Sequence, residues 1–245
     1  MFANIKPWAA IVSVLLVTSA SRADVVINWS DASVSINVTD AQNATITGLT
    51  TGDMVVPFLA TISSSGSQQE ISLLGPLGAN ANPLNLNLPA TRVGSTLMTV
   101  EISIPGYVMV NPIFDLLDID AAASTNPPFS SWQDQITFLD PSSGYVFTPV
   151  APTRYSISGN QITAVLGPNI ANGSTAANVN VALSGITSSI RYAYGPGPFD
   201  QLGQNQRHGI SNITIQALAI PEPGMACLGS LAAIAAALVW RRRNG

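Results

Sequence analysis

The chain has 245 residues, a single cysteine and a formal net charge of −4 at neutral pH. Segment 24–220 holds twelve of the thirteen acidic residues but only four of the nine basic ones, so its own charge is about −8, and it has no lysine. Such a surface disfavours nucleic acid, whose binding requires Lys and Arg to neutralise phosphates. The segment also lacks cysteine, which excludes disulfides from it.

The first 23 residues carry the features of an export signal. Lys6 precedes an apolar core over residues 8–17, and small side chains at Ser21 and Ala23 follow. This order is typical of a secretory signal peptide, a helix that signal peptidase removes by cutting between Ala23 and Asp24. An uncleaved anchor is the alternative, but a core of about ten residues is too short to span a bilayer.

Residues 24–220 have the pattern of β-strands. Short runs of alternating or β-branched residues are separated by turn-forming Gly, Pro, Asn and Ser, and no stretch shows a helical period over eleven or more residues. Strands at this spacing predict one all-β domain, an antiparallel, jelly-roll-like β-sandwich, with a hairpin turn at Ser158-Gly159-Asn160. The predicted strands are 25–29, 33–38, 44–47, 55–62, 71–74, 84–88, 96–104, 108–114, 135–139, 145–148, 155–157, 161–166, 179–183, 186–194 and 210–218.

Four aspartates form the main candidate ligand site. Asp115, Asp118 and Asp120 fall within six residues, and Asp134 follows a Pro-containing loop. In an extended chain Asp118 and Asp120 share one face, and Ca²⁺ prefers such oxygen ligands, so we predict a structural calcium site here. Solvated turn aspartates are the alternative, because Asp often bonds its own backbone in turns. An Asp-Ile-Asp strand end followed by an aromatic-x-Asp segment is similar to modules of bacterial surface β-sandwich proteins.

Three aromatic residues are candidates for binding a sugar. Tyr192 and Tyr194 lie two positions apart, so they share one face of a strand, and Trp132 lies two positions before Asp134. Flat rings with polar tips stack on sugars at recognition sites. Packing in the core explains the same residues equally well.

The sequence offers little for catalysis. His208 is the only histidine and lies in a polar stretch that we predict to be a surface loop, and no Gly-x-Ser-x-Gly elbow is present. With no second histidine and no available cysteine, a zinc site is disfavoured. Glu70 and Glu101 are the only glutamates of segment 24–220, and nothing predicts that they converge as a glycosidase requires. We predict a protein that is not an enzyme, with a secreted polysaccharide hydrolase as an alternative.

The last 25 residues form a second targeting segment. Pro221-Glu222-Pro223 ends the strand pattern, because proline cannot donate to a β-ladder. An uncharged run of 17 residues, 224–240, follows, and Arg241, Arg242 and Arg243 stop it. This pattern predicts a transmembrane helix whose basic end stays in the cytoplasm. Its length is at the short limit for a bilayer of ~30 Å, which suits a temporary anchor.

The order of Pro-Glu-Pro, apolar helix and Arg cluster resembles the PEP-CTERM sorting signal of Gram-negative bacteria that build exopolysaccharide or biofilm matrix. Ile220 stands where that family usually has Val. The resemblance covers about a tenth of the chain. It implies recognition by an exosortase, a membrane-embedded transpeptidase that cuts near Pro221-Glu222-Pro223 and transfers the protein to the envelope. A permanent anchor without processing is the alternative.

These features predict three parts: a signal peptide (1–23), an extracellular β-sandwich domain (24–220) and a sorting signal (221–245). We expect a protein of the cell surface or extracellular matrix, transiently anchored in the inner membrane, with a non-catalytic structural or adhesive role in exopolysaccharide or biofilm. Its expected partners are signal peptidase, exosortase and extracellular polysaccharide. A carbohydrate-binding module is the alternative function.

Overall fold

The computed structural model describes residues 22–65, 70–72, 77–78, 80, 82–88, 97–123, 131–140, 144–167, 174–198 and 206–220. Arg22–Ala219 form one compact unit. Residues 1–21 of the predicted signal peptide and the whole predicted sorting signal, 221–245, lie outside the described residues. In the part of the chain that is described, no helix is both long enough and apolar enough to cross a membrane.

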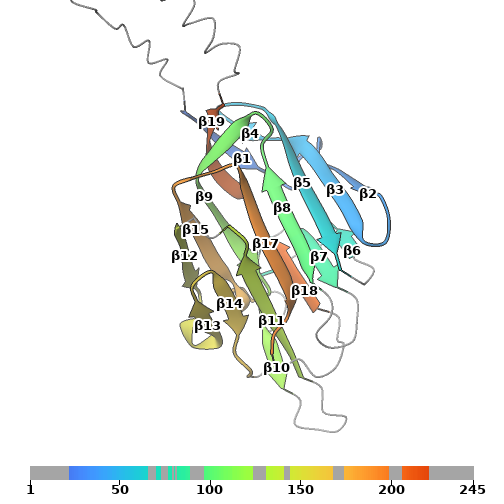
Figure 1. Ribbon diagram of the computed structural model, residues 1–245, viewed down its shortest axis with the longest axis vertical. Coiled ribbons are helices and arrows are strands. Elements are labelled where there is room, and N and C mark those ends of the chain that lie inside the picture. Colours follow the sequence, from blue (N-terminus) through green and yellow to red (C-terminus); the bar gives the residue numbers. More distant parts are fainter. Residues whose placement is uncertain are drawn as a thin grey trace, which may run out of the picture. The chain divides into compact units, whose positions relative to one another are not determined.

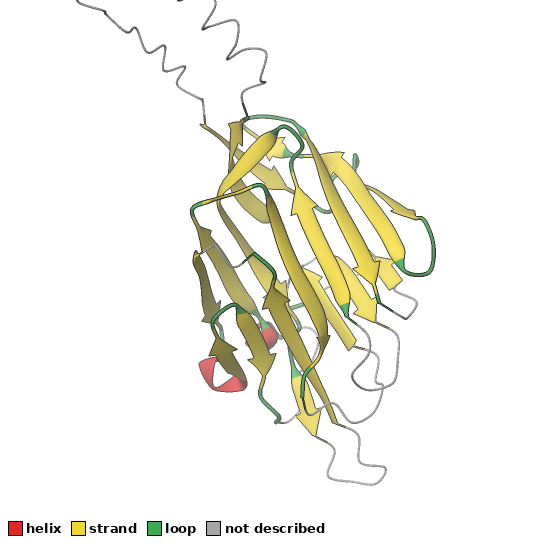
Figure 2. Ribbon diagram, in the orientation of Figure 1, coloured by secondary structure: helices red, strands yellow, loops and turns green. Residues whose placement is uncertain are grey.

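Antiparallel strands make up almost all of the described secondary structure, together with two single turns of 3-10 helix, η1 (Pro152–Arg154) and η2 (Thr175–Ala177) (Figure 2). This confirms the all-β, antiparallel prediction. The strands are β1 (Arg22–Ile27), β2 (Ser35–Val38), β3 (Asn43–Leu49), β4 (Thr51–Gly52), β5 (Pro57–Ser64), β6 (Glu70–Ser72), β7 (Leu84–Leu88), β8 (Met98–Ser103), β9 (Tyr107–Leu117), β10 (Ala121–Ala123), β11 (Ser131–Phe138), β12 (Gly144–Pro149), β13 (Tyr155–Ser158), β14 (Gln161–Ala164), β15 (Val179–Ser184), β16 (Ile186–Thr187), β17 (Ser189–Pro196), β18 (Gln206–Ile210) and β19 (Ile213–Ala219).

The strands form two sheets, here called sheet A and sheet B (Figure 1). Sheet A has the order β4-β1-β19-β9-β18-β7-β6, with β15 and β16 also pairing with β9, and β12 pairing with β15. Sheet B has the order β13-β14-β11-β17-β8-β5-β3-β2, with β10 pairing with β11. The first and last strands, β1 and β19, are neighbours along their whole length, from Arg22 opposite Leu218 to Ile27 opposite Ile213.

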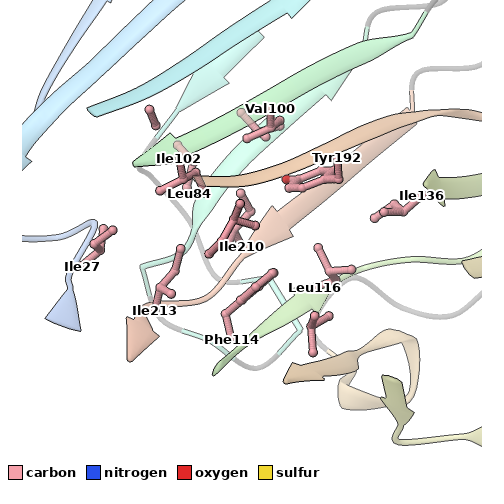
Figure 3. Close-up of a cluster of buried hydrophobic side chains, with 14 of the residues drawn as sticks. Ile27, Leu84, Val100, Ile102, Phe114, Leu116, Ile136, Tyr192, Ile210 and Ile213 are labelled. Carbon is pink, nitrogen blue, oxygen red and sulfur yellow. The ribbon is translucent and has the colours of Figure 1, made fainter. Parts of the chain in front are cut away.

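Alternation along the strands places apolar side chains between the two sheets. In β8, Met98, Val100 and Ile102 are buried, whereas the residues between them are half-buried on the outer face. One hydrophobic cluster draws side chains from both sheets (Figure 3). Trp29, which follows β1 of sheet A, packs edge-on against Phe58 of sheet B with ring centroids 5.6 Å apart. The sheets therefore face each other across a shared core in a sandwich-like arrangement.

Two runs that were predicted as single strands are each divided into two strands in the structure. Run 186–194 is split into β16, which pairs with β9 of sheet A, and β17, which pairs with β8 and β11 of sheet B. The β pattern in the sequence is unbroken there because both halves alternate in the same way. Run 210–218 is split at Ser211-Asn212 into β18 and β19, and the Ser211 backbone and hydroxyl bond the backbone of Asp115.

The predicted hairpin is confirmed. β13 and β14 pair antiparallel, with Ser158 opposite Gln161. Gly159 in the turn has a φ of +59°, a left-handed conformation that glycine adopts at no steric cost.

Candidate functional site

Three of the four predicted aspartates lie close together. Asp118 and Asp120 follow the end of β9, and Asp134 lies in β11. The pairing of β10 with β11 sets Ala121 opposite Gln133, so Asp120 and Asp134 meet next to it. The backbone N–H of Asp134 donates to the Asp120 carbonyl (2.9 Å), and the backbone N–H of Asp120 donates to Asp134 Oδ2 (3.0 Å). We call Asp118, Asp120 and Asp134 the acidic cluster.

Two aromatic side chains donate hydrogen bonds to two carboxylates of the acidic cluster. The Tyr194 hydroxyl donates to Asp134 Oδ1 at 2.9 Å, and Trp132 Nε1 donates to Asp120 Oδ1 at 3.1 Å. Asp134 is almost wholly buried, and Asp120 is buried as well. Burial, and then the nearby Asp120 charge, raise the pKa of Asp134 well above its ordinary value. Burial therefore opposes the charged form of this carboxyl.

Asp118 has a different environment. Its φ of +60° turns the chain out of the extended conformation assumed from the sequence. β18 runs beside the end of β9, with Gly209 opposite Leu117, and this brings Arg207 Nε to 3.6 Å from Asp118 Oδ2. Burial, followed by repulsion from Asp120, raises the pKa of Asp118 to about 6 against the opposing effect of Arg207.

Asp118 is the buried member of this ion pair, since Arg207 is 38% exposed, and one Asp118 oxygen has no partner among the described residues. Asp118 Oδ1 is buried and accepts no hydrogen bond from the residues that the structure describes, and only 7% of the side chain is exposed. A buried acceptor without a partner costs free energy, because it has lost its water and gained nothing in return. Asp118 Oδ1 is thus the point of the cluster at which a cation or a donor would be most favourable.

Asp115 does not belong to the acidic cluster. It lies within β9, and its Oδ1 accepts a hydrogen bond from Asn180 Nδ2 of β15 at 2.8 Å. The prediction of a four-aspartate site is corrected in this respect, because Asp115 precedes the turn that carries Asp118 into the cluster. Among the described residues, no three His, Cys, Asp or Glu side chains are placed to hold one metal ion.

The predicted platform of exposed tyrosines is corrected. Tyr192 and Tyr194 are fully buried, since the outward positions of β17 are taken by Arg191 and Ala193. Their rings face the core and present no surface for stacking on a sugar. Trp132 is half-buried, with its indole N–H bonded to Asp120.

His208 is also misplaced by the sequence prediction. It lies within β18, fully buried, and not in a surface loop. Its Nε2 is 2.9 Å from the Tyr192 hydroxyl, and its ring lies against Tyr194 with centroids 4.0 Å apart. Burial lowers the pKa of His208 to about 3, so the ring is neutral near pH 7. The remaining nitrogen, Nδ1, has no hydrogen-bond partner in the described part of the chain.

The two glutamates lie in different sheets. Glu70 is in β6 of sheet A, and Glu101 is in β8 of sheet B. Glu101 Oε2 is 3.4 Å from Arg191 Nε on the outer face of β17. Each of the two side chains is 43% exposed, so this is a surface ion pair of small energetic value.

Sequence reasoning missed two residues of the site. Arg207 contacts Asp118, but in the sequence it stands only as one of four basic residues of the domain. Tyr155 starts β13 near the acidic cluster, and burial together with the charges of Asp120, Asp134 and Asp118 raises the pKa of its hydroxyl. The pairing of distant strands creates both contacts, so no local pattern could have found them.

Comparison of the chain with protein-family models, with curated proteins and with solved structures finds no match.

Proposed function

We propose that this chain is an exported protein of the cell surface or extracellular matrix, with a non-catalytic structural or adhesive role in exopolysaccharide or biofilm. The fold proposed for that role is a jelly-roll-like β-sandwich, supported by the two facing antiparallel sheets. Signal peptidase would release the N-terminus, and an exosortase would act near Pro221-Glu222-Pro223 after transient anchoring in the inner membrane. The support for sorting is the resemblance of the C-terminal segment to the PEP-CTERM signal.

The main support for the adhesive role is the composition of the outer face of sheet B. The strand registers place Asn37, Thr45, Thr61, Glu101 and Arg191 in one row across five strands. The Glu101–Arg191 pair neutralises itself, so the row has no net charge. Hydroxyl and amide side chains occupy most of the surrounding outward positions: Ser35, Thr47, Ser63, Thr99, Ser103, Gln135, Thr137, Gln161 and Thr163.

Such a face suits a neutral polysaccharide. Hydroxyl and amide groups donate and accept hydrogen bonds, as sugar hydroxyls also do, and the absence of net charge on the row avoids desolvating an unpaired ion. The domain as a whole is acidic. This row differs, because it has no net charge and therefore neither repels nor attracts a sugar chain. Many weak contacts along a repeating chain would give adhesion through multivalency.

The test is co-sedimentation of the exported protein with the exopolysaccharide purified from the producing cells. Thr45 and Thr61 lie opposite each other on β3 and β5, and the double variant Thr45→Ala/Thr61→Ala should lower the bound fraction severalfold. Thr214→Ala, an exposed threonine of sheet A, is the matched control and should bind as the parent does. Equal binding of all three proteins would contradict the role of this face.

We also propose that the turn after β9 binds a structural calcium ion through Asp118 and Asp120. Water and backbone carbonyls would supply its other ligands, because no three acidic side chains of the described residues surround one point. The support is the buried Asp118 Oδ1, which accepts no hydrogen bond from any described residue, and the repulsion between Asp118 and Asp120. A divalent cation with oxygen ligands would relieve both penalties. The ion would hold the turn after β9, where the Asp120 N–H already donates to Asp134 of β11, without taking part in any reaction.

A further inference from the structure

The predicted export cut falls inside a paired strand of the described structure. β1 begins at Arg22, two residues before Asp24, and runs antiparallel to β19. Removing Arg22 and Ala23 deletes two of the six register pairs with β19 and leaves four. The remaining part of β1 keeps Val25 and Ile27, both fully buried in the core. The sandwich-like core is therefore compatible with a chain that begins at Asp24.

The backbone of Asp24 is bonded on both sides by one residue. Its N–H donates to Asp53 Oδ2 at 3.3 Å, and its carbonyl accepts from the Asp53 backbone N–H at 2.9 Å. The turn that carries Asp53 follows β4, which pairs with β1 with Gly52 opposite Val25.

Gly52 permits this close approach. Its φ is +111°, and a Cβ atom at this position would lie 2.5 Å from the Asp24 carbonyl oxygen. A side chain there would push the turn away from β1. The fold thus holds a carboxylate next to the nitrogen of the scissile Ala23–Asp24 bond.

We infer that Asp53 is the binding partner of the amino terminus that the export cut creates, and this inference rests on the export proposed above. Hydrolysis breaks the Ala23–Asp24 amide bond with one water molecule. Ala23 leaves with a carboxylate, and the Asp24 nitrogen becomes an ammonium group. The bond from one uncharged amide N–H to the Asp53 carboxylate then becomes an ion pair, in which an ammonium group offers up to three donors to the same carboxylate. Cleavage thereby adds an ion pair that fastens the end of β1 to the turn after β4.

The amino acid composition makes this ion pair directly measurable. Lys6 is the only lysine of the chain and is lost with the signal peptide, so the processed protein has one amine, on Asp24. An amine-reactive N-hydroxysuccinimide ester modifies only the unprotonated amine. A neighbouring carboxylate stabilises the protonated amine and therefore slows the reaction.

In the experiment, cells express the full-length chain and the protein is recovered after export. It is then labelled with this ester at pH 7.5, and the labelled peptides are identified and quantified by mass spectrometry. Asp53→Asn keeps the size of the side chain but removes its charge, and we expect its Asp24 amine to react about two- to fivefold faster than that of the parent, as for an exposed ion pair. Asp40→Asn is the control, because Asp40 bonds its own turn at Gln42 and Asn43, and it should react as the parent does. High salt should reduce the difference between the parent and Asp53→Asn.

The outcomes separate the two proposals. Label on an amine other than that of Asp24 shows that the export cut lies elsewhere, which overturns the proposed processing. Label on Asp24 with equal rates in the parent and in Asp53→Asn supports the cut but overturns the ion pair. Label on Asp24 with a faster Asp53→Asn reaction supports both.

Discussion

The hydroxyl of Tyr194 donates a hydrogen bond to Asp134 Oδ1 over 2.9 Å, and both residues are buried between the two sheets. This bond joins β17 to β11 at the acidic cluster, where burial and the charge of Asp120 act together on Asp134. The interior of this domain is therefore not purely apolar at one end, and its stability should depend on a few polar contacts.

Removing the Tyr194 hydroxyl should destabilise the fold. In Tyr194→Phe, Asp134 Oδ1 loses its donor while remaining buried, and we expect a loss of about 1–3 kcal/mol in the free energy of unfolding. Tyr107→Phe is the matched control, because Tyr107 is half-buried at the start of β9 and its hydroxyl is not part of this bond. Urea unfolding measures both variants. Equal effects of the two substitutions would show that the Tyr194–Asp134 bond adds nothing.

His208 should make the domain sensitive to acid. Its pKa is about 3 in the folded state and about 6.5 in the unfolded chain, so between these values only the unfolded chain takes up the proton. Stability from this group is fully present above pH 6.5 and is lost as the pH falls towards 3. Between pH 7 and pH 4 the loss should be about 3 kcal/mol.

The variant His208→Gln isolates this effect from the titration of the carboxyl groups. The free energy of unfolding of the parent should fall relative to that of the variant as the pH is lowered. A difference between the two proteins that is constant with pH would contradict a buried neutral histidine.

Calcium should stabilise the domain through the acidic cluster. We expect millimolar calcium to raise the melting temperature of the parent and to leave the Asp118→Asn/Asp120→Asn variant unchanged. Asp115→Asn is the control, because Asp115 bonds Asn180 outside the cluster, and it should keep the calcium response. No shift in the parent, or an equal shift in the double variant, would rule out the site.

Truncation of Phe138 should be costly, because its ring fills the space between the two sheets. Its ring contacts Phe114, Tyr145 and Phe147 of sheet A and Tyr192 of its own sheet B, with centroid distances between 4.3 and 6.4 Å. Phe138→Ala should cost about 3–5 kcal/mol by leaving a cavity between the sheets. The neighbouring Leu139 is 36% exposed, and Leu139→Ala should cost much less, as surface substitutions usually do. Comparable losses in urea unfolding would contradict this description of the core.

Local patterns in the sequence predict the strands well and their partners poorly. Strand 84–88 matches β7, and the Gly159 turn is found because the need for a left-handed residue is visible locally. The break between β16 and β17 is not visible, since an alternating run looks the same whether or not the chain crosses to the other sheet.

The same limit explains the candidate site. Period-2 geometry shows that Tyr192 and Tyr194 share a face, but not which face. Arg191 was the available signal. It lies next to Tyr192 in the same strand, and a charged side chain favours the exposed face, which leaves the buried face to Tyr192 and Tyr194. The contacts of Asp118 with Arg207 and of Asp120 with Asp134 join separate strands, so they depend on the strand order, which the sequence does not display.

The most direct test of the account is the fate of the full-length chain in cells with and without an exosortase. We expect intact-mass analysis to find, in cells that have the enzyme, a chain that starts at Asp24, has lost the segment after Pro221-Glu222-Pro223 and is located at the outer surface or in the matrix. Without the enzyme, the chain should keep this segment and stay in the inner membrane. The same mass and the same location in both strains would contradict the central claim.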